Sequence, residues 1–338
     1  MFGKRFTYFA TCAPGVEPLL HEEVRQLGLG RPEQQVGGVR FEGTMPEAWR
    51  ANLWLRTAVR VLRREARFEC PSESAVDEGV GSVDWSAFIE PTGTLWVDAQ
   101  TKDSVLDHSR YLQQRVKDVI VDQVRAADGT RPSVDRDTAD VRVHLHLYRD
   151  RATLSVDTSG ASLHRRGWRN SQGRAPLAET LAAACVLRSG WDRRGPLLDP
   201  FCGTGTLLVE GAMIAAGMAP GLSRERFGFE TWRDHDAAGW ASLRDEARDK
   251  IRIPRKLRLV GHDIAPDRLE ETRGHLDGLG FTELGDLEVA DARAFAPRAG
   301  WNGTVVSNLP YGERVGDRVE ELHGDFGAQL KALTGYRV

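Results

Sequence analysis

The chain has 338 residues. At about 150 residues per domain, this length predicts two or three domains and excludes a single small module. Hydrophobic residues make up 41% of the chain and charged residues 28%, which excludes a disordered or collagen-like protein, and the net charge of -3 restricts any polyanion site to a local patch.

The sequence gives no sign of a membrane span or of secretion. No stretch approaches the roughly 18 consecutive apolar residues that a membrane span needs. The segment from Phe2 to Cys12 carries charge and lacks the apolar core of a signal peptide. The four cysteines are scattered without a C-x-x-C pair, so we expect neither a disulfide framework nor a metal site. These features predict a cytoplasmic protein in a reducing compartment.

Two small α+β units are predicted in the first half of the chain. Residues 6–11, 16–27, 36–41, 46–55 and 59–68 alternate between strand-like and helix-like patterns. A strand at 95–99, a helix around 112–124 and a hairpin with Asp150-Arg151 in its turn follow. His144 and His146 share one face of the hairpin; with no third ligand nearby, we expect them to face solvent rather than to bind metal.

A basic segment separates this half from the rest. Residues 163–174 contain four arginines and no acidic residue, which predicts an interdomain linker. The same arginines are candidate phosphate contacts, with a solvated linker as an equally weighted alternative. They are Arg165, Arg166, Arg169 and Arg174.

The second half alternates strands and helices, which predicts a doubly wound parallel sheet. Helices are expected at 177–189, 206–216, 266–278 and 320–333, and strands at 197–200, 257–264, 287–290 and 304–308. The class of fold is therefore α/β for this half, preceded by α+β units.

A glycine-rich turn follows the first of these strands. The strand ends in Asp199, and Gly203 and Gly205 allow the backbone to turn tightly and approach a ligand at the carboxyl edge of the sheet. Leu208 stands where the pattern G-x-G-x-x-G requires a third glycine, which disfavours a dinucleotide site. A plain turn between strand and helix is the alternative.

Two further acidic residues follow the next two strands. Asp263 can accept hydrogen bonds from both hydroxyls of a ribose, because its carboxylate offers two oxygens at a fixed strand end. Asp291 can accept from an adenine amino group. Each aspartate alone is more typical of a helix N-cap. Three successive strand ends that carry aspartate favour a shared ligand site.

The last strand leads into Asn308, Leu309, Pro310 and Tyr311. The amide oxygen of Asn308 and the carbonyl that follows it can accept both hydrogens of an exocyclic amine. Pro310 stiffens the backbone, and Tyr311 offers an aromatic face for a planar ring. A simple turn after a strand is the alternative.

These motifs together resemble a known family. Asp199-Pro-Phe-Cys-Gly-Thr-Gly-Thr with Asn308-Leu-Pro-Tyr resembles the class I S-adenosylmethionine-dependent methyltransferases that modify exocyclic amines of bases. MAPGLSRERFGFETW at 218–232, HRRGWR at 164–169 and PYGER at 310–314 resemble one branch, the THUMP-containing RNA guanine-N2 methyltransferases, and the resemblance covers most of the chain.

The resemblance implies an enzyme that transfers a methyl group from S-adenosylmethionine to the N2 amine of a guanosine, in 23S rRNA or in tRNA. It implies a ferredoxin-like domain at 1–70, a THUMP RNA-binding domain at 71–160, a basic linker at 161–175 and a methyltransferase domain at 176–338. The catalytic residues would be Asn308, Pro310 and Tyr311. The donor would be bound by Asp199, Phe201, Gly203, Gly205, Asp263, Asp291 and Ala292.

Two departures from the family pattern bear on these expectations. Leu309 stands where the family usually has a proline. The sequence ends at Val338, at the start of a fifth strand, whereas the family sheet has seven strands. We therefore expect the native product to be longer, with a mass above 37.5 kDa.

Three other functions stay open on the sequence. A nicotinamide-dependent oxidoreductase is disfavoured by the missing third glycine. A DNA amino-methyltransferase shares the Asn-x-Pro-Tyr motif but does not explain the THUMP-like half. An RNA-binding protein with a decayed catalytic domain is disfavoured by the retained aspartates and glycines.

Overall fold

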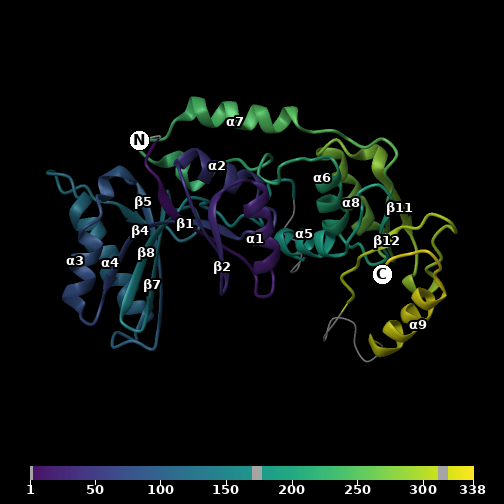
Figure 1. The fold of residues 1–338 in the computed structure, drawn as a ribbon, viewed down its shortest axis with the longest axis horizontal. Coiled ribbons are helices and arrows are strands. Elements are labelled where there is room, and N and C mark those ends of the chain that lie inside the picture. The colour runs from purple at the N-terminus through teal and green to yellow at the C-terminus, as the bar shows by residue number, and fades with distance from the viewer. Residues whose placement is uncertain (1–2, 170–176, 311–318) are drawn as a thin grey trace. The chain divides into compact units, whose positions relative to one another are not determined.

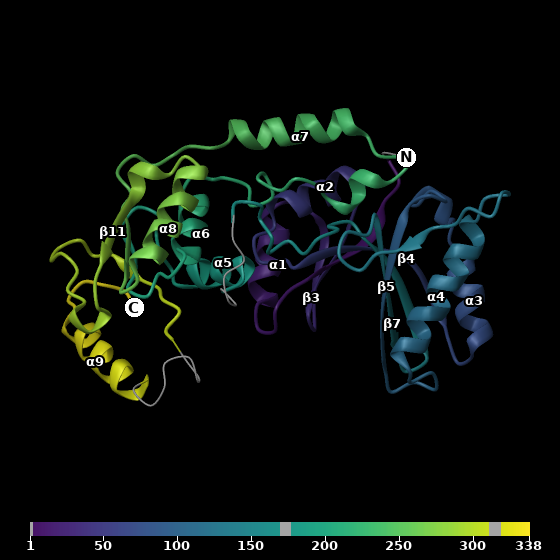
Figure 2. The ribbon, with the colours of Figure 1, turned by 180° about the vertical axis from the view of Figure 1, so that it is seen from behind.

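A computed structural model describes residues 3–169, 177–310 and 319–338. The chain forms two compact units (Figures 1 and 2). Unit 1 consists of residues 1–163 and 224–244, and unit 2 consists of residues 164–223 and 245–338.

In the described part of unit 1, one mixed sheet has the strand order β2-β3-β1-β4-β8-β7-β5-β6. Its strands are β1 (Phe6–Thr11), β2 (Gly30–Gln35), β3 (Gly38–Gly43), β4 (Arg60–Glu69), β5 (Thr94–Lys102), β6 (Ser133–Val134), β7 (Val141–Tyr148) and β8 (Arg151–Asp157). Its helices are α1 (Glu17–Gln26), α2 (Met45–Trp54), α3 (Glu73–Gly81) and α4 (Ser109–Val124), with a 3-10 turn at Trp85–Ala87.

Antiparallel pairing of β4 with β8 joins the two predicted α+β units into this single sheet. The pairing runs from Leu62 opposite Asp157 to Glu69 opposite Arg151. Alternate residues of each strand face the helices, so Val61 of β4 and Val156 of β8 are fully buried. The expected boundary near residue 70 therefore does not separate two sheets.

The hairpin of β7 and β8 differs by one residue from the prediction. Its two-residue turn consists of Arg149 and Asp150, which both have positive φ angles, of 50° and 55°. Arg151, expected in the turn, is instead the first residue of β8 and lies opposite Tyr148. A two-residue hairpin turn of type I′ requires positive φ at both central positions, which explains this placement.

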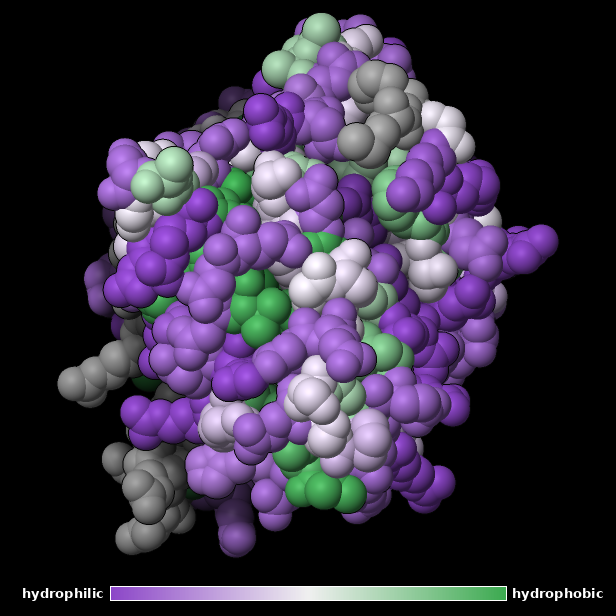
Figure 3. Space-filling model, turned by 90° about the vertical axis from the view of Figure 1, so that its left-hand side faces the viewer, coloured by the Kyte–Doolittle hydropathy of each residue, from purple (hydrophilic) through white to green (hydrophobic). Residues whose placement is uncertain are grey.

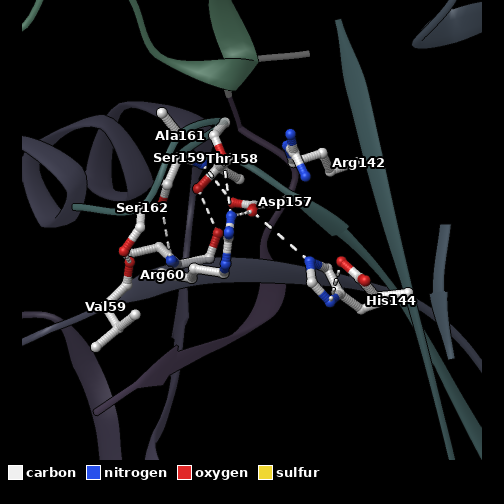
Figure 4. A network of polar contacts seen from close by, with 12 residues as sticks. Val59, Arg60, Arg142, His144, Asp157, Thr158, Ser159, Ala161 and Ser162 are labelled. Atoms are coloured by element: carbon white, nitrogen blue, oxygen red, sulfur yellow. Dashed lines mark hydrogen bonds and ion pairs between the residues drawn. The ribbon is translucent and has the colours of Figure 1, made fainter. Parts of the chain in front are cut away.

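Asp157, the last residue of β8, lies in a network of polar contacts (Figure 4). Its carboxylate forms an ion pair with Arg60, and His144 Nε2 lies 3.6 Å from Asp157 Oδ2. His144 Nδ1 also lies 3.9 Å from Asp98 Oδ2. His146 is exposed, as expected. His144 is instead half-buried beside two aspartates, so it does not face solvent as predicted.

Residues 224–244 depart from the expected division of the chain, which assigned them to the second domain. They pack within unit 1. The rings of Trp240 and Trp49 lie 6.3 Å apart, and both side chains are buried. A Cβ atom on Gly228 would lie 2.7 Å from the backbone nitrogen of Gly160, so only glycine permits this approach. The burial of large aromatic rings explains why this segment belongs to unit 1.

The surface beside α3 and α4 is mostly hydrophilic (Figure 3). Its hydrophobic groups form separate spots rather than one continuous patch. Most large apolar side chains of the two helices are buried instead, among them Val76, Val80, Leu112, Val116 and Ile120. Among residues 3–169, 177–310 and 319–338, no helix is long and apolar enough to cross a membrane.

Unit 2 contains the predicted doubly wound parallel sheet. Its described strands have the order β11-β10-β9-β12, and every pair is parallel. They are β9 (Leu197–Asp199), β10 (Leu259–Asp263), β11 (Gly285–Val289) and β12 (Thr304–Val305). The helices are α5 (Glu179–Arg188), α6 (Thr206–Ala215), α8 (Pro266–Gly278) and α9 (Val319–Ala332), and α7 (Ala237–Asp249) begins in unit 1 and ends in unit 2. Short 3-10 turns lie at Gly228–Thr231 in unit 1 and at Thr282–Leu284 and Ala292–Ala294 in unit 2.

Two hydrophobic clusters cover the two faces of this sheet. Leu197 packs in a cluster with side chains of α5, α6 and α8, and the adjacent Leu198 packs in another with Phe326 of α9. Successive residues of a strand point to opposite faces, so helices cover both sides. The first described strand of this sheet in chain order, β9, lies between β10 and β12, which places the reversal of strand order between β9 and β12. Ligands of open α/β sheets bind at such a point, beyond the carboxyl ends of the strands.

Candidate active site

The turn after β9 depends on two glycines in the left-handed region. Gly203 has a φ of 52° and Gly205 a φ of 77°. A Cβ on Gly205 would lie 2.5 Å from Thr272 Cγ2, so this glycine permits close packing of the turn against α8. A Cβ on Gly203 would meet no atom within 4 Å. Gly203 therefore has open space beside its Cα atom that a ligand can occupy.

The missing third glycine of the turn has a counterpart on the neighbouring strand. Leu208 of α6 is fully buried. A Cβ on Gly261 of β10 would lie 2.7 Å from Leu208 Cδ1. The third glycine of the dinucleotide motif serves close packing of helix on strand. Here Gly261 provides this space from the strand, and Leu208 fills it from the helix.

Asp263 connects the end of β10 to the turn after β9. Its carboxylate accepts a hydrogen bond from Gly203 N at 3.0 Å and one from Ala265 N at 2.9 Å. The hydroxyl of Thr272 donates to the carbonyl oxygen of Gly203 at 2.9 Å. A carboxylate offers about four lone-pair positions, so Asp263 can still accept from the hydroxyls of a ribose. The carboxylate and the open space beside Gly203 fit the sugar of a nucleoside.

Asp199 is buried where β9 meets β12. Its carboxylate accepts hydrogen bonds from Phe201 N at 3.2 Å and from the Ser307 hydroxyl. Burial raises the pKa of Asp199 to about 7, and these two hydrogen bonds oppose the rise only in part. Sequence reasoning missed Ser307. Its position immediately after the strand, next to Asn308, was the signal that could have identified it.

Asp291 and Ala292 lie after β11. Asp291 caps a 3-10 turn by accepting from Arg293 N at 2.9 Å, and its carboxylate also pairs with the Arg293 side chain. These bonds hold the pKa of Asp291 below its usual value. Ala292 is buried in the cluster that contains Phe326. Asp291 therefore acts as an N-cap, which was the alternative expected from the sequence. Contact of Asp291 with an adenine stays a prediction.

Asn308 is exposed beyond the end of β12. Leu309 packs against the cluster that contains Phe326, which gives this departure from the family pattern a structural role. Pro310 O lies 2.9 Å from His323 Nε2, so α9 contacts the backbone at Pro310. Tyr311 lies outside the described residues. Asn308 therefore lies at the carboxyl edge of the sheet, next to Ser307, and the Ser307 hydroxyl donates a hydrogen bond to Asp199.

Cys202 lies inside the turn but lacks the properties of a nucleophile. Its side chain is buried, and burial raises the pKa of its thiol, with the carboxylates of Asp199 and Asp263 adding to the rise. A thiol with a raised pKa carries little of the reactive thiolate. The structure agrees with a packing role for Cys202.

The basic segment is placed differently from the expected linker, because residues 164–169 are part of unit 2. Arg165 is exposed. Arg166 is 2% exposed and forms an ion pair with Glu210 at 3.1 Å. Arg169 pairs with Glu179 at 2.9 Å. Arg174 lies outside the described residues. This placement favours structural roles over phosphate contact for Arg166 and Arg169.

The fold and the edge site place unit 2 in a class of methyltransferases of known structure. A predicted N6-adenine-specific DNA methylase from Listeria monocytogenes is 32% identical, with a TM-score of 0.88 over 98% of this chain and 87% of that one. SMU.472, a putative methyltransferase complexed with SAH, is 30% identical, with a TM-score of 0.87 over 98% and 88%.

Residues 166–337, just over half of the chain, match the family model of the RMKL-like methyltransferase domain, and the chain belongs to this family. Residues 7–62 match the RlmL ferredoxin-like domain, and residues 70–157 match the THUMP domain. The ribosomal RNA large subunit methyltransferase K/L of Pseudomonas entomophila is 42% identical over 328 residues, which cover 94% of this chain and 45% of that relative. The chain thus spans about half the length of the curated relatives that it matches.

The raised pKa of Asp199 predicts a pH-dependent stability. The folded state holds the proton of Asp199 up to about pH 7, whereas the unfolded chain loses it near pH 3.9. The free energy of unfolding should therefore fall between about pH 4 and pH 7, by up to about 4 kcal/mol. Asp199→Asn removes this ionisation, so it should raise the melting temperature at pH 8 and have less effect at pH 5.

Differential scanning calorimetry at the two pH values measures this difference. Asp192→Asn is the matched control, because backbone hydrogen bonds lower the pKa of Asp192 and keep it ionised at both pH values. An effect of Asp199→Asn that is equal at pH 5 and pH 8 would show that Asp199 is already ionised in the folded chain.

Proposed function

We propose that this chain transfers a methyl group from S-adenosylmethionine to the exocyclic N2 amine of a guanosine, in 23S rRNA. The main observation in support is that two features lie at the carboxyl edge of the sheet, within the residues that match the methyltransferase family. They are the glycine turn, which is hydrogen-bonded to Asp263, and Asn308. The names of the curated relatives and the match to a THUMP domain support RNA as the substrate.

The donor would bind at the glycine turn. S-adenosylmethionine supplies, when bound, an electrophilic methyl group on a positively charged sulfur. The backbone of Gly203 and Gly205, with Asp199 and Phe201 before them, would line its position. Asp263 would accept hydrogen bonds from the ribose hydroxyls, because its carboxylate keeps free lone pairs in addition to those that accept from two backbone N–H groups. Asp291 and Ala292 would lie near the adenine.

The acceptor would bind at Asn308. Its side-chain oxygen would accept a hydrogen bond from the guanine amine and so orient the nitrogen lone pair. The neighbouring Ser307 is bound to buried Asp199, which fixes the backbone before Asn308. Pro310 would limit the motion of the segment, and Tyr311 would stack on the base. Orientation of this kind can contribute about 7 to 11 kcal/mol to lowering a reaction barrier.

The name of one similar protein suggests a second candidate. The similar structure from Listeria monocytogenes carries the name of a predicted N6-adenine-specific DNA methylase. Adenine in DNA is therefore the second candidate for the methylated base. The same motif after β12 would serve either amine, so the structure of the product distinguishes the two.

A basic strip on β4 supports RNA binding by unit 1. Arg67 is exposed, and Arg64 lies 5.6 Å from the centre of the Phe9 ring. Burial lowers the pKa of Arg64, repulsion by Arg67 and Arg40 lowers it further, and the carboxylate of Glu33 opposes this fall. Aromatic rings among arginines are typical of surfaces that bind single-stranded nucleic acid. Arg165 and Arg174 stay among the proposed RNA contacts, whereas the ion pairs of Arg166 and Arg169 favour structural roles for these two arginines.

Nucleoside analysis tests the proposed reaction. The purified chain is incubated with labelled S-adenosylmethionine and, separately, with unmodified 23S rRNA, tRNA and DNA. We expect label in N2-methylguanosine from 23S rRNA. Label in tRNA alone would move the substrate to tRNA, and N6-methyladenine in DNA would establish the second candidate. Binding of S-adenosylmethionine without transfer to any of them would contradict the proposal.

Asn308→Ala should abolish transfer and leave donor binding nearly unchanged, because Asn308 acts on the acceptor. Calorimetric titration with S-adenosylhomocysteine measures the donor site. Asn302→Gly is the control, since Asn302 is exposed and has a φ of 49°, which glycine adopts readily. Equal losses of transfer and of donor binding in Asn308→Ala would reject its assigned role.

Replacement of Arg64 and Arg67 by alanine should weaken RNA binding and make it less dependent on salt. Each lost phosphate contact reduces the slope of log affinity against log salt by about 1. Arg125→Ala is the control, because Arg125 pairs with Asp122 at the exposed end of α4. The measurement is RNA affinity by fluorescence anisotropy at several salt concentrations. A slope equal to that of the unmodified chain would exclude this strip as a phosphate-binding surface.

A further inference from the structure

Arg169 contacts three elements of unit 2 with three different nitrogen atoms. Its Nε donates to Glu179 at the start of α5, at 2.9 Å. Its two terminal nitrogens donate to Thr204 Oγ1 at 3.0 Å and to Thr206 Oγ1 at 2.8 Å. Thr204 lies between the two glycines of the turn, and Thr206 is the first residue of α6. One side chain therefore binds both threonines of the Gly203-Thr204-Gly205-Thr206 turn.

The environment of Arg169 fixes this arrangement. Its side chain is 10% exposed, and that of Glu179 is 7% exposed. The guanidinium carbon lies 4.9 Å from the centre of the Trp168 ring. Trp168 in turn packs edge-on against His275, at 5.0 Å between ring centres. His275 Nδ1 lies 3.0 Å from the carbonyl oxygen of Thr204.

Thr204 is thus held at two atoms, and both contacts come from residues that are linked to each other. Arg169 binds its hydroxyl, and His275 binds its carbonyl. Trp168 links the two, because its ring contacts both the guanidinium of Arg169 and the imidazole ring of His275. The adjacent Gly203 is held separately by Asp263 and Thr272. Because left-handed glycines allow many backbone conformations, such contacts decide which one the turn adopts.

We propose that Arg169 is a positioning residue for the methyl donor. Its guanidinium holds Thr204 and Thr206 so that the turn keeps the conformation that receives S-adenosylmethionine. The role needs the planar fork of an arginine, because a lysine ammonium is a compact charge that cannot reach three separated acceptors with fixed geometry. This inference rests on the proposed donor site, but not on the identity of the methylated nucleic acid.

Arg169→Lys tests the role while it keeps a positive charge beside Glu179. We expect the affinity for S-adenosylhomocysteine to fall about tenfold, as the loss of two hydrogen bonds to the turn would give. The Michaelis constant for S-adenosylmethionine should rise similarly, with little change in the turnover number. A purely structural role would instead lower the melting temperature and leave donor affinity unchanged, and this result would overturn the proposal.

Arg224→Lys is the matched control. Arg224 is also a buried arginine, and it donates to the carbonyl oxygens of Ala161 at 2.7 Å and of Ser162 at 2.9 Å, within unit 1. Its substitution should lower the melting temperature and leave the affinity for S-adenosylhomocysteine within about twofold of the original. A comparable loss of affinity in both variants would show that the effect is general destabilisation, and would reject the proposal.

A double-mutant cycle identifies the atoms that carry the effect. Thr204→Val with Thr206→Val removes the two acceptors and keeps the shape of the side chains. In a chain that already carries Arg169→Lys, these substitutions should cause little further loss of affinity. The lysine variant has already lost the hydrogen bonds to the two hydroxyls, so removal of the hydroxyls takes away no further contact. Additive losses would show that Arg169 acts through other contacts. Failure of the unmodified chain to bind S-adenosylhomocysteine would instead reject the proposed function itself.

Discussion

The candidate site depends first on the bond between the Asp263 carboxylate and the backbone nitrogen of Gly203. This bond ties the end of β10 to the turn after β9, and Thr272 of α8 holds the other side of the same glycine. Hydrogen bonds to a charged carboxylate are stronger than those between neutral groups. With both its N–H and its C=O engaged, Gly203 keeps a left-handed conformation and leaves space beside it for a ligand.

Local sequence patterns predicted the elements of this site well. The helix α8 matches its predicted range, and the strands that carry Asp199 and Asp263 lie where the apolar runs indicated them. Spacing alone also gave the two glycines of the turn, because few residues other than glycine adopt a positive φ readily. The parallel pairing of the strands in unit 2 followed from the alternation of strands and helices, since crossover connections force parallel pairing.

Contacts between distant segments were not predictable in this way. The pairing of β4 with β8 joins residues 82 to 95 positions apart, and no local pattern encodes such a partner. Residues 224–244 contribute aromatic side chains to unit 1, although their sequence neighbours belong to unit 2. Arg166 and Arg169 were predicted as phosphate contacts, or else as solvated linker residues, because their partners Glu210 and Glu179 lie in later helices. Charge in a sequence shows its sign but not whether it is neutralised.

Amide hydrogen exchange of the full chain, with and without saturating S-adenosylhomocysteine, tests whether the methyl donor binds at the carboxyl ends of β9 and β10 and at the turn between Asp199 and Thr206. We expect slower exchange in peptides that cover residues 199–209 and 259–268, with little change in β7 and β8 of unit 1. Saturable binding that leaves the exchange of both peptides unchanged, and slows it elsewhere, would place the donor at another site.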